Sequence, residues 1–418
     1  MELATTKEVR PLARKPKRDL TMEEQLARGP LDLPFLMLVL MLVGFGLVML
    51  FSASYATALY DSKPPVYNNP LYYIQRQAIF AGAGLVCMYI ISKMNYQLFR
   101  PLSILVLGVA IVLLILVLTP FGVVINGAKR WLYVFLVAGP TFQPSEIAKV
   151  AVILFFAARL SKRDTELKPR FTRRTAWGRF LNWLEKAGLL ELVPYGLVLG
   201  TVLLLVLLER HMSGTILVMV GAASVLLVSG VKLRWLFILG GTAAAVLALV
   251  IVNTGYMTAR VELWLNPWSD PSDKGFQTIQ SLLSIASGGL LGKGLGNSIQ
   301  KFGFLPEPEN DMIFSIVVEE LGLLGGGMVL LLFALLILRG YWLALHARDK
   351  FGTLTIVGII TLLAAQVFLN IGVVTNLIPN TGISLPFFSY GGTALMIHLA
   401  EMGIVLSVSR QIPAPKKD

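Results

Sequence analysis

Ten long apolar runs dominate the sequence and limit the chain to folds that cross a lipid bilayer. Each run is close to the roughly 20 residues that a helix needs to span the hydrocarbon core. In lipid, a helix satisfies its backbone N–H and C=O groups within one segment. We therefore expect an all-α polytopic membrane protein with ten transmembrane helices, at residues 34–56, 74–92, 101–120, 143–160, 191–208, 213–231, 233–253, 311–338, 353–377 and 387–409.

The composition agrees with this class. Hydrophobic residues make up 56% of the 418 residues and charged residues only 14%, which is outside the usual range of soluble domains. The only cysteine, Cys87, lies within an apolar run, so an intramolecular disulfide and a cysteine-based metal site are excluded. The first 33 residues lack the apolar core and cleavage site of a signal peptide, and we interpret them as a tail.

The distribution of Lys and Arg predicts the orientation in the membrane. An even number of spans puts both termini on one side. If the N-terminus is inside, nearly three times as many Lys and Arg residues fall in inner segments as in outer ones, and cytoplasmic segments carry this excess. We expect cytoplasmic tails at residues 1–33 and 410–418, a membrane domain at 34–409 and a large extracellular loop at 254–310.

The net charge of +12 does not indicate nucleic acid, because the basic residues lie at the ends of apolar runs. The basic segment 159–186 is interpreted either as a short amphipathic helix on the inner face or as a cluster that only sets topology. No nucleotide site is expected, since the glycines between Gly288 and Gly296 lack the P-loop spacing.

Three polar segments rich in Gly and Pro fall on the predicted outer side: residues 126–131, 260–311 and 379–386. The longest ends in Asp311, at the start of the eighth span. Long polar loops of this kind carry function more often than the elements that they connect. We expect the three segments to meet above one cavity.

Ionisable residues within a bilayer cost a few kcal/mol each and are functional candidates by default. Glu146 and Lys149 lie three residues apart on one helical face and can neutralise each other. They are candidates for catalysis, or they form a pair that only locks helix packing. Glu319 and Glu320, in the eighth span, are interpreted as structural or secondary polar residues.

Asp311 has two interpretations from spacing alone. A lone acid at a helix N-terminus can be a cap that the helix dipole favours. The residues before it, Glu307, Glu309 and Asn310, make an acidic rim that would attract a divalent cation. Sites rich in oxygen and poor in His suit Mg²⁺ or Mn²⁺, so Asp311 is also a candidate metal ligand.

Other polar residues favour structural roles. Gln366 with Asn370, and His398 with Glu401, are spaced to share helix faces, and we expect them to form hydrogen bonds between helices. The short turn at residues 209–211 is expected to be solvated. The sequence contains no HExxH motif and no credible Ser-His-Asp order, so zinc hydrolysis and serine nucleophile chemistry are unsupported.

Four segments resemble the SEDS family (shape, elongation, division and sporulation), the bacterial peptidoglycan glycosyltransferases that include FtsW, RodA and SpoVE. The FtsW and SpoVE branch is slightly favoured. Departures occur at Glu309 and Asn310, where many relatives have His-Thr, and at residues 209–213. The segments are NGAKRW with FQPSEIAK, the stretch from WLNPWSDPSD to EPENDMIF, VVEELG, and TGISLPFFSYGG.

The resemblance implies an activity: polymerisation of lipid II, a disaccharide-peptide on undecaprenyl pyrophosphate, on the outer face of the bacterial cytoplasmic membrane. Such a transfer needs a base for the acceptor hydroxyl and positive charge for the leaving pyrophosphate. The motif matches make Asp311 the general base, with Glu146 and Lys149 also catalytic and a divalent cation assisting. The expected substrate-binding residues are Lys129, Arg130, Trp131, Lys301, Glu307, Ser389 and Tyr390.

The resemblance also implies partners, namely a class B penicillin-binding protein transpeptidase and other cell-wall synthesis proteins. Two alternatives stay open. The chain could instead be a flippase that carries lipid II outward, because buried charges in polytopic helices often mark a transport path. It could also be a scaffold that recruits the transpeptidase. A role in division, elongation or sporulation is not distinguished.

Overall fold

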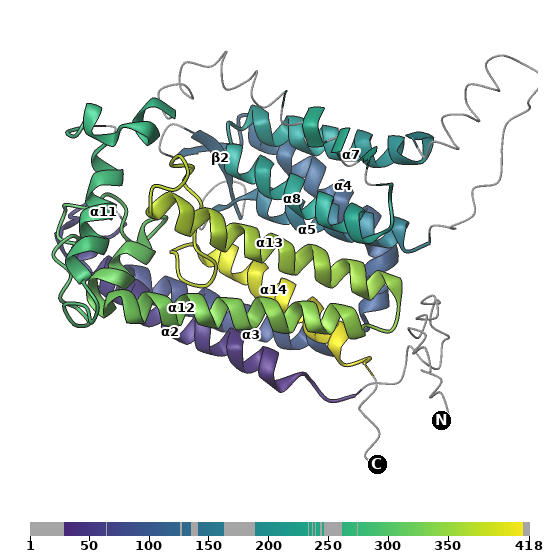
Figure 1. Cartoon of the computed structure of the whole chain (residues 1–418), viewed down its shortest axis with the longest axis horizontal. Coiled ribbons are helices and arrows are strands. Elements are labelled where there is room, and N and C mark those ends of the chain that lie inside the picture. Colours follow the sequence, from purple (N-terminus) through teal and green to yellow (C-terminus); the bar gives the residue numbers. More distant parts are fainter. Residues whose placement is uncertain are drawn as a thin grey trace, which may run out of the picture.

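The long helices lie side by side along the long axis of the molecule (Figure 1). The computed structural model describes residues 29–412 except 64, 126–127, 135–140, 163–188, 233, 236, 239, 243–244, 246–260 and 274. Four predicted features therefore lie largely outside the described residues: the span at 233–253, the basic segment 159–186 and the tails at 1–33 and 410–418.

Ten helices have defined bounds in the part of the chain that the structure describes. They are α2 (Leu33–Tyr60), α3 (Tyr72–Lys93), α4 (Phe99–Leu118), α5 (Pro144–Leu160), α7 (Leu189–Leu208), α8 (Met212–Val228), α11 (Phe276–Gly288), α12 (Ile313–His346), α13 (Lys350–Val374) and α14 (Gly392–Ser409). Short 3₁₀ turns are η1 (Tyr96–Leu98) and η2 (Pro267–Ser269).

Six helical segments in the described ranges are long and apolar enough to cross a membrane: α2, α3, α4 together with η1, α12, α13 and α14. The apolar part of α7 and the whole of α8 are shorter. The chain is thus a mostly helical, multi-pass membrane protein. The full set of ten spans stays a prediction.

Local sequence signals fix several helix starts. Asp32 caps α2 by accepting from the Phe35 amide at 3.0 Å, and Asp349 caps α13 through the Gly352 amide at 3.1 Å. Pro144 opens α5, where its fixed φ and missing N–H are harmless. Asp is favoured at a helix start because its carboxylate accepts from an unpaired amide of the first turn. Pro is favoured there because it has no N–H that would stay unpaired.

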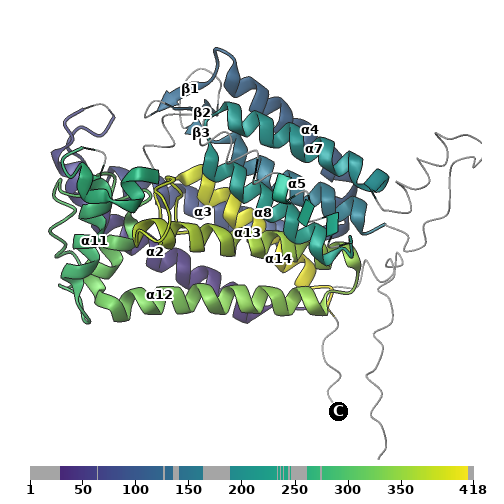
Figure 2. The ribbon, with the colours of Figure 1, turned by 45° about the horizontal axis from the view of Figure 1, so that its top comes forward.

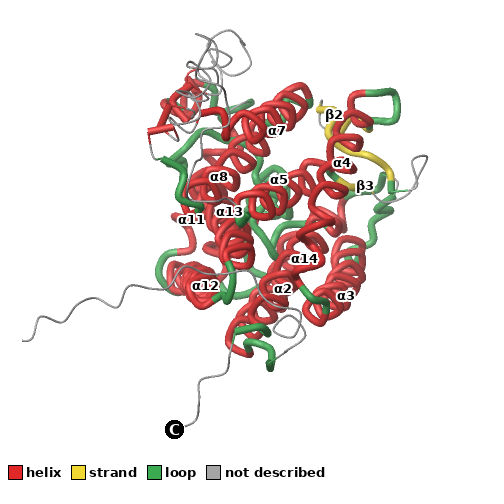
Figure 3. The backbone as a smooth tube through the Cα atoms, turned by 90° about the vertical axis from the view of Figure 1, so that its right-hand side faces the viewer, coloured by secondary structure: helices red, strands yellow, loops and turns green. Residues whose placement is uncertain are grey.

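The centre of the bundle is formed by α5, α13 and α14. Viewed along the helices, the other long helices surround these three (Figure 3). Most residues of α5 are buried, including Phe156 and Leu160, and α13 buries Ile356, Ile359 and Ile360. The side chains of Lys149, Gln366 and Glu401 on these central helices are buried and thus held away from lipid.

The expectation of an all-α fold is wrong in one place. Residues before α5 form a small antiparallel sheet in the order β1 (Val123–Ile125), β2 (Ala128–Tyr133) and β3 (Thr141–Phe142), which projects beyond the helices in Figure 2. The β-branched and aromatic residues in these short runs favour strands. This sheet positions the Lys129–Trp131 motif beside the bundle.

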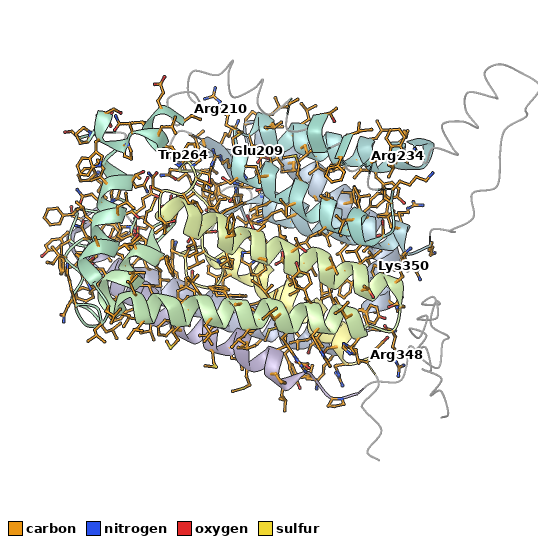
Figure 4. The ribbon with its side chains drawn as sticks, in the orientation of Figure 1. Glu209, Arg210, Arg234, Trp264, Arg348 and Lys350 are labelled. Atoms are coloured by element: carbon orange, nitrogen blue, oxygen red, sulfur yellow. The ribbon has the colours of Figure 1, made fainter. Side chains whose placement is uncertain are left out.

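Both described ends of the chain lie at one end of the bundle. The Gly29 amide donates to the Arg410 carbonyl at 2.6 Å, and Arg410 Nε donates back to the Gly29 carbonyl at 3.1 Å. Figure 4 places Arg348 and Lys350 toward this end, whereas Glu209 and Trp264 lie toward the end that carries α11. This agrees with an even number of crossings.

Candidate functional site

Asp311 lies in the turn that leads into α12, and it is not the cap of that helix. The cap position is Met312, which makes no side-chain capping bond. Gln277 Nε2 on α11 donates to Asp311 Oδ1 at 3.4 Å. Asp311 is partly exposed, and its carboxylate contacts this neighbouring helix.

The predicted outer segment 379–386 also lies beside Asp311. Asn380 Nδ2 donates to Gln277 Oε1 at 2.8 Å. At Gly382, which has a φ of +64°, a Cβ atom would stand 3.9 Å from Asp311 Oδ2. Two of the predicted outer segments, 260–311 and 379–386, therefore do meet at this acid.

The Glu146–Lys149 pair sits in the first turns of α5. Lys149 Nζ lies 2.6 Å from Glu146 Oε2, with Lys149 1% exposed. The two charges form an ion pair, although no hydrogen bond with aligned geometry reaches Glu146 Oε2. Lys149 Nζ also donates to Gln366 Oε1 on α13 at 3.4 Å. The pair is thus held at the centre of the bundle.

Two amides on α13 connect these charged groups. Asn370 Nδ2 donates to the Asp311 carbonyl at 2.8 Å and to the Ile383 carbonyl at 2.6 Å. One turn away, Gln366 reaches Lys149 and the Ser384 carbonyl, the latter at 3.2 Å. The segment that holds residues 383 and 384 therefore links the surroundings of Asp311 with those of Lys149.

The same α13 amide reaches a further buried group. Gln366 Nε2 lies 3.4 Å from His398 Nε2, and His398 Nδ1 lies 3.2 Å from Glu401 Oε2. The Gln366–His398 contact joins α13 to α14 as expected, whereas the His398–Glu401 contact lies within α14. Together they extend the polar chain from Lys149 into the bundle interior.

The Lys129–Trp131 motif lies on β2, beside the turn between α7 and α8. Arg130 Nε donates to the Glu209 carbonyl at 3.4 Å, and Lys129 Nζ donates to the Leu118 carbonyl at 3.4 Å. The side chains of Lys129, Arg130 and Trp131 are partly buried. The motif is thus anchored to the bundle, with its guanidinium beside the turn that contains His211.

Two of the three residues of that turn are buried, contrary to the expectation of a solvated loop, whereas Arg210 is exposed. Glu209 and His211 are 2% and 8% exposed. His211 Nδ1 lies 3.0 Å from Gln143 Nε2 and 3.1 Å from Ser145 Oγ. Burial raises the pKa of Glu209 to about 8 against the lowering effect of Arg130, and burial lowers the pKa of His211 to about 3.

A second buried charged cluster, the Glu319–Glu320 clasp, lies where α12 bends. It consists of Glu319, Glu320, Lys293 and Lys301. Lys293 Nζ is 2.7 Å from Glu319 Oε1, and Lys301 Nζ is 2.8 Å from Glu320 Oε1. Lys301 is 3% exposed and also bonds Ser52 Oγ at 3.1 Å. Lys301 is therefore occupied within the fold; its predicted contact with substrate stays a prediction.

The remaining predicted residues lie close to the turn that precedes Asp311. The Tyr390 amide donates to the Glu309 carbonyl at 2.8 Å, and Ser389 Oγ accepts from the Leu385 amide at 2.7 Å. Glu307 is exposed and accepts from Asn310 Nδ2 at 3.1 Å. These contacts place Ser389, Tyr390 and Glu307 on segments that surround the start of α12.

Sequence reasoning did not single out Gln277 and the short helix α11. The signal was present, because Gln277, Ser281 and Ser284 recur at helical spacing. Ser281 Oγ is 3.2 Å from Ser315 Oγ, and Ser284 Oγ donates to Glu319 Oε2 at 3.1 Å. The polar face of α11 thus contacts the N-terminal turns of α12.

No group of three or more His, Cys, Asp or Glu side chains able to hold a metal occurs in the described ranges. Asp311 lies where the segments 260–311 and 379–386 meet. A cation bound to Asp311 would need further oxygen ligands from water or substrate. Mg²⁺ commonly takes its ligands in this way.

Comparison with known proteins identifies the family. The model of the cell cycle protein family FtsW, RodA and SpoVE matches residues 33–413. The chain is 39% identical over 381 residues to stage V sporulation protein E of Bacillus subtilis, covering 91% of this chain and 97% of that protein. It is 37% identical to the probable peptidoglycan glycosyltransferase FtsW of Geobacter metallireducens, covering 91% and 95%.

Solved structures agree. A chain from a peptidoglycan synthase complex, described for its structural coordination of polymerization and crosslinking, matches with a TM-score of 0.68 at 30% identity, covering 93% of this chain and 99% of that one. Thermus thermophilus rod shape determining protein RodA matches with a TM-score of 0.61 at 27% identity, covering 92% and 98%. This chain belongs to the FtsW, RodA and SpoVE family of cell cycle proteins, the SEDS family.

Proposed function

We propose that this protein is a peptidoglycan glycosyltransferase that polymerises lipid II into glycan strands on the outer face of the bacterial cytoplasmic membrane. Family membership supports the activity, because relatives that match over nearly their whole length are named as probable peptidoglycan glycosyltransferases. The main structural support for the site is the α13 bridge, formed by two amides one helical turn apart. Asn370 Nδ2 donates to the Asp311 backbone carbonyl, and Gln366 Oε1 accepts from Lys149 Nζ.

Asp311 acts as the general base. Transfer of a sugar from a lipid pyrophosphate requires removal of the proton from the attacking hydroxyl of the acceptor sugar. A partly exposed carboxylate, oriented by Gln277 at 3.4 Å, suits this task. As in inverting glycosidases, one group activates the nucleophile while other groups handle the leaving group.

Lys149 stabilises the negative charge that develops on the leaving pyrophosphate. Its ammonium is held in a buried, low-dielectric position, where a fixed charge acts more strongly than in water. Glu146, at 2.6 Å, orients Lys149. Arg130, on β2, adds a second cationic group, and its neighbours Lys129 and Trp131 contact the same headgroup.

A divalent cation, Mg²⁺ or Mn²⁺, completes the charge balance. Asp311 would hold it together with the phosphate oxygens of the substrate, because Mg²⁺ readily shares its coordination shell with phosphates. When bound, the cation would neutralise part of the pyrophosphate charge. We expect chelation with EDTA to reduce the polymerisation rate at least about tenfold, with recovery after Mg²⁺ or Mn²⁺ is restored.

The substrate is lipid-linked, which explains a site at the membrane boundary. The prenyl tail stays in lipid while the sugar-pyrophosphate headgroup occupies the region between Asp311 and Lys149. The structural neighbour from a peptidoglycan synthase complex supports a partnership with a class B penicillin-binding protein transpeptidase. That partner would crosslink the strands that this chain makes.

The activity is tested with purified protein in proteoliposomes that contain lipid II and Mg²⁺ or Mn²⁺. Glycan polymers are measured by gel electrophoresis, and lipid II in each leaflet is measured by its accessibility to an impermeant reagent. We expect polymer from the wild type and none from Asp311→Ala. If both proteins instead moved lipid II across the bilayer without polymer, the chain would be a flippase.

A scaffold role is tested in cells depleted of the native protein. The catalytic proposal expects Asp311→Asn to reach wild-type levels in the membrane and to fail to support growth. If Asp311→Asn supported growth as well as the wild type, recruitment of partners would be the main function.

A further inference from the structure

Apolar side chains are exposed and charged side chains point inward in the segment Gly289–Phe304. This segment joins α11 to the turn before Asp311. Its exposed residues with side chains are apolar except Asn297. They include Leu291 at 77% exposure and Leu290 at 63%; the others are Leu295, Ile299, Phe302 and Phe304. A loop surrounded by water would direct its charges outward and bury such side chains.

The charges of this segment point inward instead. Lys301 is 3% exposed, and the side chain of Lys293 is 27% exposed. Both ammonium groups are bound by the carboxylates of Glu319 and Glu320. The segment therefore presents an apolar surface outside and neutralises its cations inside the protein.

The backbone of the segment also finds its partners inside the protein. The Gly296 and Ser298 amides donate to the Glu320 carboxylate at 3.0 and 3.3 Å. The Ile299 amide donates to Glu319 Oε1 at 3.1 Å. Irregular backbone can lie at membrane depth only where the protein satisfies it, and the two acids meet this requirement.

The bend in α12 completes the arrangement. Gly322 has a φ of +70° and interrupts the helix. The Lys293 and Gly294 amides donate to the carbonyls of Glu319 and Glu320 at 3.0 and 2.9 Å. Below the bend, the Leu323 amide donates to the Gly289 carbonyl at 2.9 Å. The segment thus exchanges backbone hydrogen bonds with α12 where the helix cannot make its own.

Two helices give the depth of this contact. Ser52 on α2 contacts Glu320 at 2.7 Å and lies twenty residues beyond Asp32, or about 30 Å at 1.5 Å per residue. Asp32 pairs with Arg339 near the opposite end of α12, 3.0 Å from Nε. About 30 Å is the thickness of the hydrocarbon core. The clasp therefore lies at the boundary of the leaflet on the Asp311 side.

The apolar surface of the segment continues onto the lipid-facing side of α12. Leu323 and Leu324 are 56% and 60% exposed and follow directly below the bend, where their amides bond the segment. Exposed leucines on a helix of this length and apolarity contact acyl chains. The segment and the helix therefore present one continuous apolar surface.

We propose that the segment Gly289–Phe304, which follows α11, is a re-entrant segment whose apolar side is inserted into the lipid leaflet on the Asp311 side, with phospholipid acyl chains as the occupant. The Lys and Arg distribution predicts this leaflet to be the outer one. In this arrangement, the clasp neutralises the charges of an irregular segment and satisfies its backbone in a region with little water. The proposal does not depend on the enzymatic activity.

The wild-type protein in phospholipid nanodiscs tests the insertion directly. A phospholipid with a photoactivated diazirine on its acyl chain is incorporated, and labelled peptides are mapped by mass spectrometry. We expect labelling within Gly289–Phe304 and on α12 below Gly322, and none in the exposed turn at residues 270–273. Labelling of α12 with an unlabelled Gly289–Phe304 segment would overturn the proposal.

Spin labels measure the depth and exclude a protein occupant. In a Cys87→Ala background, Leu291→Cys and, separately, Leu295→Cys carry a nitroxide. Controls are Leu331→Cys on the exposed face of α12 and Asp273→Cys in the exposed turn. We expect collisions with oxygen to exceed those with a water-soluble nickel complex severalfold at residues 291 and 295, as at Leu331. Nickel accessibility like that of Asp273, or inaccessibility to both reagents, would contradict lipid contact.

Discussion

Two buried clusters of Lys and Glu lie in this bundle, and they differ in how completely their polar atoms are satisfied. In the Glu319–Glu320 clasp, each carboxylate receives hydrogen bonds from a lysine, from serine hydroxyls and from backbone amides. In the α5 pair, Glu146 Oε2 has the Lys149 ammonium at 2.6 Å, and no serine hydroxyl or backbone amide donates to it within the described structure. Asn370 Oδ1, on the α13 bridge, has no hydrogen-bond partner there.

The difference favours a structural role for the clasp and agrees with the role proposed for the α5 pair. Buried polar atoms in native proteins are almost always hydrogen-bonded, so an unsatisfied group requires an explanation such as catalysis or a missing ligand. The clasp leaves no such group on Glu319 or Glu320. We infer that the clasp holds the fold, whereas the surroundings of Glu146 and Asn370 receive the substrate.

The largest contrast is expected from two matched double variants. Glu146→Gln with Lys149→Met removes both charges of the α5 pair, so no unpaired charge stays buried. We expect polymerisation to fall about 10²-fold to 10³-fold, the usual cost of losing a transition-state charge partner, with little change in thermal unfolding. Lipid II polymerisation by purified protein measures the rate.

The matched control is Glu320→Gln with Lys301→Met. It removes the same two charges from the clasp and weakens the acceptor for two backbone amides. We expect a lower unfolding temperature and polymerisation by the folded protein within a few-fold of wild type. The comparison fails if this control loses polymerisation as strongly as the α5 variant while unfolding at the wild-type temperature.

The next effect in size is the single change Lys301→Met. It leaves Glu320 charged and buried without its lysine, which typically costs about 3 to 5 kcal/mol. Thermal unfolding in detergent measures this loss. If Lys301 acted instead as a substrate-binding residue, the variant would unfold normally and its KM for lipid II would rise.

The smallest effect is a pH dependence from the α7–α8 turn. The pKa of Glu209 is raised to about 8 by burial, so its contribution to stability is lost as pH rises toward 8. His211, with its pKa lowered to about 3 by burial, destabilises the fold only as pH falls below its unfolded value near 6.5. Between pH 6.5 and 8 only Glu209 of these two changes stability, by at most about 2 kcal/mol.

Glu209→Gln checks this assignment, because an amide of similar shape does not ionise. Unfolding temperatures are measured from pH 6.5 to 8 for both proteins. We expect the wild-type temperature to fall with rising pH and the Glu209→Gln temperature to stay constant. A parallel decline in both proteins would assign the dependence to another group.

Apolar run length was enough to predict a multi-pass helical protein, because bilayer thickness fixes the length of a spanning helix. The extracellular loop at 254–310 stays a prediction. In the sequence, its part between α11 and Asp311 contains two charges, Lys293 and Lys301. Their partners Glu319 and Glu320 come 26 and 19 residues later, and only the folded chain shows that these charges cancel.

The candidate site was predicted in part. Helical spacing was enough to place Glu146 and Lys149 on one face, and the ion pair at 2.6 Å agrees. The α13 bridge could not be predicted in the same way. Asn370 meets Asp311 only through long-range packing of α13 against the start of α12, and sequence spacing contains no information on such contacts.

Asp311 is the proposed general base, and an isosteric substitution tests this role most directly. Asp311→Asn keeps the shape and can still bond Gln277, yet its amide cannot accept the proton of the acceptor hydroxyl. Initial rates of lipid II polymerisation are measured for wild type and Asp311→Asn at saturating Mg²⁺, with unfolding temperatures as a check on folding. We predict equal unfolding temperatures and a rate lower by about 10²-fold or more; a rate within tenfold of wild type would contradict the assignment of Asp311 as the base.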